Sequence, residues 1–188
     1  MIVGNPSIFA IESQITEAYE RLSFRALGSF ILLLDGFRYG VYEPHATMLA
    51  VSFDQVQRRI DHRGNHLTSF SDADAKVVAD AYRAALYGLE YGVPYPGMPL
   101  EDFRSMVISS RIGWAPDGDE AFDDSSYVLQ FDVGARVRLI AFKTREDGSC
   151  DPSTLKDVWL ESEQFYGILR HWHDSFVDEW DSLPKIMD

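Results

Sequence analysis

Two histidines separated by three residues, His62 and His66, come nearest in this sequence to a metal-binding or catalytic motif. Residues four apart on a helix face the same side, so both imidazoles could bind one zinc ion if further ligands joined them. A catalytic pair would also need a general base. Gly64 and its polar neighbours favour a loop here, and the surrounding sequence holds no other catalytic motif. The motif is thus a weak one, and a small enzyme or ligand-binding domain that uses the His62/His66 region is kept as the alternative hypothesis for the function.

The acidic run 117–124 is a second group of side chains with possible chemistry. A calcium loop of the EF-hand type places acids or Asn at positions one, three and five, Gly at six and Glu at twelve. Asp117 and Asp119 fit the first two positions, but Ala121 and Phe122 occupy the next two and a valine stands at the twelfth. The pattern therefore predicts no metal site.

Other short catalytic signatures are missing from the chain. Cys150, the only cysteine, lies in a Gly-Ser-Cys-Asp-Pro turn without an adjacent base that would activate it as a nucleophile. The sequence contains no Walker loop, no G-x-G-x-x-G and no G-x-S-x-G. We therefore predict a protein that is not an enzyme and needs no cofactor.

The net charge of −13 is unevenly distributed over the 188 residues. The segment 101–124 holds seven acidic and two basic residues, and the segment 157–188 holds eight acidic and two basic residues. Phosphate contacts need clustered Lys and Arg, so this charge argues against nucleic acid and against anionic membranes as partners. A field of one sign steers basic partners toward the protein, although it also describes an ordinary solvated surface.

The elements that must position these residues are strands and hairpins in most of the chain. The run Ala26–Leu34 is a buried strand, and Asp35-Gly36 is a hairpin signal that leads into a strand over 37–42. A second hairpin is predicted over 127–133 and 137–142, with Gly134 between its strands. Further strands are expected over 7–15, 45–51, 103–109 and 157–160.

Helices are predicted from periodicity and from capping residues. Ser52 and Gln55 resemble a capping box for a short helix that reaches Ile60, and Ser71 with Asp74 precedes a clearer helix that ends near residue 89. The last helix, over 162–180, has apolar residues on one side. The predicted fold is α+β, an antiparallel sheet built from hairpins with two main helices packed against it, in a single domain over residues 1–188.

The location of the protein follows from its first residues and its cysteine content. The first basic residue is Arg21, so the chain lacks the basic start of a secretory signal. A single cysteine forms no internal disulfide, which agrees with a reducing compartment. The sequence predicts a soluble cytoplasmic protein.

Three segments occur in a characteristic order: GNPSIFAIE at 4–12, FDVG at 131–134 with VRLIA at 137–141, and FYGIL at 165–169 followed by Trp172 and the run 176–180. Together they resemble immunity protein family 42 of bacterial polymorphic toxin systems, which is of the contact-dependent inhibition type. Their order along the chain carries more weight than any one of them. Arg138 and Trp172 match the family pattern, and both are interpreted as structural, a strand Arg paired to an acid and a buried Trp.

The resemblance implies an α+β fold and a partner, a cognate toxin domain that the protein binds and neutralises to protect the producing cell. It implies no catalytic residues. A nuclease-type toxin with a basic cleft would suit the acidity of the chain, because an acidic surface can occupy such a cleft and speed the encounter. The candidate partner-binding residues all come from the acidic run: Asp117, Asp119, Glu120, Asp123 and Asp124.

Overall fold

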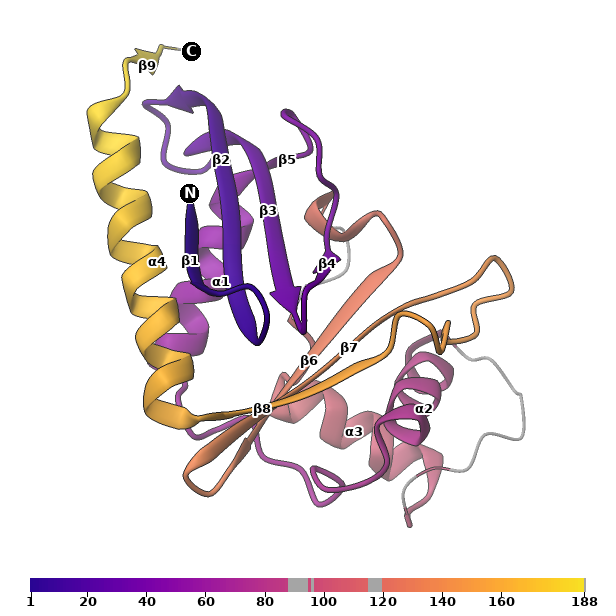
Figure 1. Cartoon of the computed structure of the whole chain (residues 1–188). Helices are drawn as coiled ribbons and strands as arrows, with labels where there is room; N and C mark the ends of the chain where they lie inside the picture. Colours follow the sequence, from indigo (N-terminus) through magenta and orange to yellow (C-terminus); the bar gives the residue numbers. More distant parts are fainter. Residues whose placement is uncertain (88–94, 96, 115–119, 188) are drawn as a thin grey trace.

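The computed structural model describes residues 1–87, 95, 97–114 and 120–187, and its strands form two sheets (Figure 1). The first sheet has the order β1-β2-β3-β4, with β5 also paired to β3 and the short β9 paired in parallel to β2. Its strands are β1 Ile2–Asn5, β2 Phe9–Tyr19, β3 Ala26–Leu34, β4 Phe37–Tyr39, β5 Thr47–Met48 and β9 Lys185–Ile186. The predicted Asp35-Gly36 hairpin is confirmed, since Leu34 pairs with Phe37 across it.

The second sheet is an antiparallel meander of three strands. It consists of β6 Ser126–Val133, β7 Arg136–Lys143 and β8 Lys156–Glu161, in that order. The turn at Gly134 has a φ of +60°, a left-handed conformation that glycine adopts without steric cost. The predicted second hairpin and the strand that follows it are confirmed.

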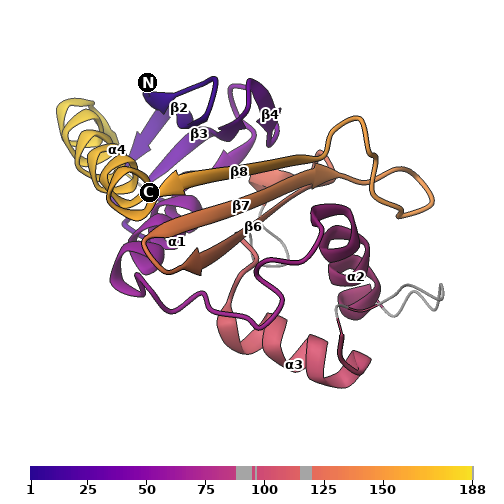
Figure 2. The same ribbon diagram turned by 60° about the horizontal axis from the view of Figure 1, so that its bottom comes forward.

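Four helices in the described ranges cover these sheets. Helices α1 (Leu49–Asp61) and α4 (Ser162–Ser182) pack with the first sheet, whereas α2 (Ala75–Tyr87) and α3 (Leu100–Ser110) lie on the far side of the second sheet (Figure 2). A short 3-10 helix, η1 (Glu120–Phe122), precedes β6. The α+β class is confirmed, with the strands divided between two sheets.

The second sheet is buried on both faces because each face contributes to a different core. On β7, Val137 and Leu139 join the core formed with the first sheet, α1 and α4, whereas Ile140 and Phe142 join the core under α2 and α3. The alternation follows from the two-residue period of a strand. Polar side chains on β6 and β7 are consequently buried too, and each needs a hydrogen-bond partner inside the protein.

Arg138 shows how one of these polar side chains is satisfied. Its guanidinium donates to both carboxylate oxygens of Asp157 at 2.8 and 2.7 Å, and to the carbonyls of Ser71 and Ala73, both at 2.7 Å. This contact fastens the segment before α2 to the second sheet. The structural interpretation of Arg138, a strand arginine paired to an acid, is confirmed.

Two strand predictions were wrong. Residues 103–109 form most of α3, because Phe103 and Val107 are buried at i, i+4 spacing and Glu101 and Asp102 lie in the first turn, where the helix dipole favours acids. Within 45–51, only Thr47 and Met48 are in a strand, and α1 begins directly after them. A short apolar run does not by itself separate a strand from a helix.

Both predicted capping residues also differ from the structure. Helix α1 begins at Leu49, three residues before Ser52, and the buried Ser52 hydroxyl has no hydrogen-bond partner among the described residues. At α2, Asp74 is the side chain that caps, since its Oδ1 accepts from the amides of Lys76 and Val77 at 3.0 and 3.1 Å. Each correction shifts a helix start by about one turn.

Replacement of Trp172 by alanine should test the packing of α4. Trp172 is fully buried between Phe30, Phe53 and Phe176, and its Nε1 donates to Ser13 Oγ at 2.9 Å. We expect Trp172→Ala to lower the free energy of unfolding by about 3–5 kcal/mol, measured by urea denaturation. The control His171→Ala changes an exposed neighbour and should have little effect. Equal midpoints for the two variants would contradict the buried helix face.

Candidate functional site

A buried carboxylate, Asp132 on β6, is the centre of a cluster of hydrogen-bonded polar side chains. Its Oδ2 accepts from the amides of Gly64 and His66, at 3.0 and 3.1 Å, and from His66 Nδ1 at 3.0 Å. Its Oδ1 accepts from the Tyr166 hydroxyl at 2.8 Å. Burial acts to raise the pKa of Asp132, but these hydrogen bonds outweigh it and leave that pKa below its ordinary value. Asp132 is therefore an anion at neutral pH.

The two histidines of the sequence motif take different places. His62 follows the last residue of α1 and is exposed, and its Nδ1 lies 2.8 Å from the Arg58 carbonyl. His66 is buried, and burial lowers its pKa below the ordinary histidine value. Its Nδ1 must carry the proton, because the Asp132 carboxylate can only accept, so a neutral ring leaves Nε2 unprotonated. The loop predicted around Gly64 is confirmed.

Arg59 is a functional candidate that sequence reasoning missed. It lies on the buried face of α1 and is only 2% exposed, with its guanidinium 4.5 Å from the Trp114 ring centroid. Nη1 donates to Gln130 Oε1 at 3.0 Å and Nη2 donates to the Gly113 carbonyl, while Nε has no hydrogen-bond partner in the described structure. Desolvation lowers the pKa of Arg59 to about 10, so it stays charged at neutral pH. A signal was available in the sequence, since Arg59 interrupts the apolar stripe that includes Val56.

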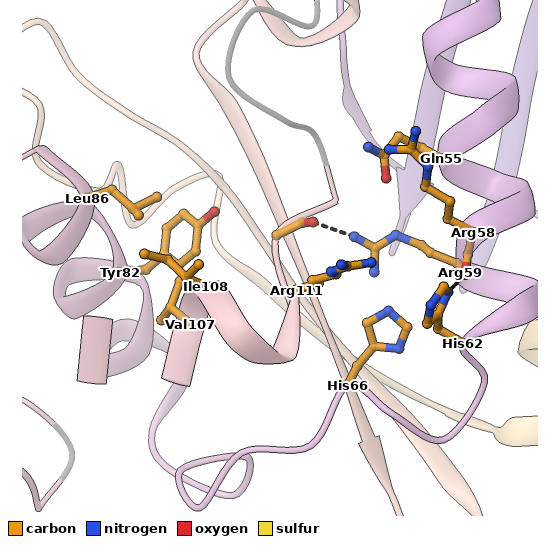
Figure 3. Close-up of a pocket in the computed structure, with 11 residues that line it drawn as sticks. Gln55, Arg58, Arg59, His62, His66, Tyr82, Leu86, Val107, Ile108 and Arg111 are labelled. Atoms are coloured by element: carbon orange, nitrogen blue, oxygen red, sulfur yellow. Dashed lines mark hydrogen bonds between the residues drawn. The ribbon is translucent and has the colours of Figure 1, made fainter. Parts of the chain in front are cut away.

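Arg59, His62 and His66 border a pocket of about 580 Å³ that opens between α1 and α3 (Figure 3). One side carries cationic or titratable groups, and the other side is formed by the apolar surfaces of α2 and α3. None of its described lining residues is acidic, in a protein whose net charge is −13. The lining residues are Gln55, Arg58, Arg59, His62, His66, Tyr82, Leu86, Val107, Ile108, Arg111 and Gly113.

The acidic run is only partly described. Asp117 and Asp119 lie outside the described residues. Glu120, the first residue of η1, and Asp123, which follows η1, are both exposed. The carboxylate of Asp124 is engaged within the protein, where it accepts from Lys143 Nζ at 2.5 Å and from the amides of Gly40 and Ser126, both at 3.2 Å.

The structure also bears on metal binding and on the cysteine. In the part of the chain that is described, no group of three or more His, Cys, Asp or Glu side chains could hold a metal ion. Cys150 is buried, and burial raises the pKa of its thiol to about 11, so the thiolate needed for nucleophilic attack is not formed at neutral pH. No helix in the described ranges is both long and apolar enough to cross a bilayer.

The buried state of His66 should make stability depend on pH. Because the pKa of His66 is lower in the folded than in the unfolded protein, the unfolded state binds more protons as pH falls through about 6.5. The free energy of unfolding should therefore fall between pH 7 and pH 5, by at most about 1.4 kcal/mol per pH unit for this group. Urea unfolding of His66→Gln at several pH values should show a shallower slope than the parent, whereas His62→Gln should keep the parent slope. Equal slopes for all three proteins would contradict a neutral, buried His66.

Comparison with known proteins identifies the family of this chain. The family model described as Immunity protein 42 matches residues 1–175. No curated protein matches the chain. Among solved structures, that of CdiI from Burkholderia dolosa AUO158 is similar in fold, with a TM-score of 0.57 and 20% sequence identity over 93% of this chain and 99% of that one. The match covers most of the 188 residues and agrees with the segments at 4–12, 131–141 and 165–172, and the chain belongs to the immunity protein 42 family.

Proposed function

We propose that this protein is a stoichiometric inhibitor that binds a cognate toxin domain in the cytoplasm and protects the cell that makes both proteins. The observation that carries the proposal is the family match over residues 1–175. The similar solved structure bears the name CdiI, and its fold agrees with this assignment. Inhibition by binding needs a complementary surface and no turnover.

The alternative, an enzyme built on the His62/His66 region, has one observation in its favour. The contact between His66 and Asp132 orients an imidazole whose Nε2 is unprotonated, which is how a general base is held in many hydrolases. The pocket beside it, however, has no Ser, Thr or Cys among its described lining residues, so a side-chain nucleophile is missing there. Acids that would accompany the histidines are also absent from that lining, where arginines stand instead. The arrangement favours binding over catalysis.

The toxin that fits the charge of this protein is basic, and we propose a nuclease-type domain. The proposed contact surface is the acidic run, with Glu120 and Asp123 exposed on the described part and Asp117 and Asp119 beyond it. Asp124 contributes to the local field, although its carboxylate already contacts Lys143. Clustered acids raise the rate of encounter with a basic cleft.

A titration separates inhibition by binding from inhibition by turnover. The activity of the cognate toxin domain should fall in proportion to added protein and reach zero near a one-to-one ratio. An enzyme that destroys or modifies the toxin would act well below that ratio, given time. Full inhibition at a tenfold deficit of this protein would contradict the proposal, and a comparison of the toxin's mass before and after exposure would identify a modification.

A salt series tests the acidic run. Exposed charges are screened beyond about 8–10 Å at physiological ionic strength, so the association rate of the parent should fall steeply as salt rises. Reversal by Asp119→Lys with Glu120→Lys should lower the association rate while folding stability changes little. The control pair Asp178→Lys with Glu179→Lys changes the same net charge on α4 and should have a smaller effect. Equal rates for both pairs would remove the acidic run from the interface.

A further inference from the structure

Among the residues that the structure describes, the guanidinium of Arg59 is a buried cation without an anion in contact. Its hydrogen bonds reach the neutral side chain of Gln130 and a backbone carbonyl, and its Nε is unpartnered within the described structure. Buried charges are normally paired, because removal from water costs several kcal/mol per ion that an opposite charge offsets. The nearby carboxylate of Asp132 acts on Arg59 only at a distance, since its oxygens are bonded to His66, Tyr166 and the amide of Gly64. Arg59 therefore has unused capacity for an anion.

Two further arginines at the mouth of the same pocket also lack an ion pair in the described part of the chain. Arg58 and Arg111 are exposed, and within the described ranges neither forms an ion pair. Arginines elsewhere behave differently, since Arg63 pairs with Glu163 and Arg138 pairs with Asp157. In a chain with 30 acids and 17 Lys and Arg, three arginines gathered around one cavity whose described lining holds no acid require an explanation.

The shape of the pocket indicates what kind of anion fits. Figure 3 shows the head groups of Arg59 and Arg111 directed into the same space, with the His66 ring close by. Facing them are the apolar side chains of Leu86 and Ile108, and Ile108 is 58% exposed at the rim. Such a site suits a group whose charged end is attached to an apolar stem, because planar guanidinium groups match a carboxylate and the apolar wall contacts methylenes.

We propose that this pocket receives an acidic side chain of the toxin, Asp or Glu, whose carboxylate binds between Arg59 and Arg111. This inference rests on the proposed function. It adds a second contact with the toxin, made by positively charged arginines, to the contact made by the negatively charged acidic run. An acidic side chain fits the pocket better than a free inorganic anion does. An anion such as phosphate would leave the apolar wall of Leu86 and Ile108 without a contact, whereas the methylene groups of Asp or Glu would contact it. Arg59 is held in place before binding by Gln130, Gly113 and Trp114, so little ordering cost remains for the docking step.

The experiment compares two double variants with the same change in charge. The pocket variant, Arg58→Gln with Arg111→Gln, removes the two exposed arginines at the mouth of the pocket. The control variant, Arg21→Gln with Arg104→Gln, removes two exposed arginines that do not line the pocket. Both pairs alter exposed side chains, so both should fold, which circular dichroism would verify. We expect the toxin domain to dissociate about 10- to 100-fold faster from the pocket variant, because lost charge-assisted hydrogen bonds at a desolvated site act mainly on the dissociation rate. The control should dissociate within about twofold of the parent.

Two added measurements identify the source of the carboxylate. Substitution of the toxin's Asp and Glu residues by Asn and Gln, one at a time, should reveal one position whose effect is not additive with Arg111→Gln. Sodium glutarate, titrated into the free protein at constant ionic strength, should bind weakly and compete with the toxin. Tight glutarate binding that is lost in the pocket variant, with unchanged toxin kinetics, would assign the pocket to a free small carboxylate and overturn the proposal.

The remaining outcomes separate this inference from the function on which it rests. If the parent binds the toxin and both double variants dissociate at the parent rate, the pocket does not contact the toxin and the inference fails, while the inhibitor function stands. If the parent shows no binding to the toxin domain, the proposed function fails and this inference fails with it.

Discussion

The buried carboxylate of Asp132 is the interaction on which the site depends. It joins three parts of the chain that are distant in sequence: the connection after α1, through Gly64 and His66; strand β6; and helix α4, through Tyr166. Removal of any one donor would leave a buried charge less well compensated, which is far more costly than the loss of an exposed contact. The network therefore specifies how α1 and α4 are placed against the second sheet.

The same network extends to the pocket. Gln130 donates from Nε2 to the Tyr166 hydroxyl at 2.8 Å and accepts from Arg59 through Oε1 at 3.0 Å, so its amide is oriented by both neighbours. Arg59 is consequently fixed by the second sheet as well as by its own helix. A pocket built on such a side chain is rigid before a partner arrives, and its arginines are exposed to solvent only at the mouth. Under the proposed binding mode, Arg59 therefore has a structural role as well as a binding role.

Sequence patterns predicted the hairpins and failed where local signals were ambiguous. Asp35-Gly36 and Gly134 define turns through backbone conformations that glycine favours, so both hairpins were found. The strand predicted over 37–42 is shorter in the structure and ends at Tyr39. The run 103–109 contains adjacent Val and Ile residues and was assigned as a strand, although the buried pair Phe103 and Val107 has helical spacing. The pocket was not predictable, because Arg59, Arg111 and His66 come together only after α1, α3 and the second sheet have packed.

Under the proposed function, charge of both signs would give this protein two separate means of selecting a partner. The net charge of −13 acts at long range and favours any basic protein, so by itself it speeds encounters without much discrimination. A cavity bordered by Arg58, Arg59 and Arg111 acts only at contact, and a basic protein without a correctly placed carboxylate would leave these charges desolvated and unpaired. This desolvation cost would weaken the complexes with wrong partners only, since a toxin with a correctly placed carboxylate would pair with the arginines. Under the proposed function, the acidic surface would set how fast complexes form, and the arginine pocket would set which of them persist.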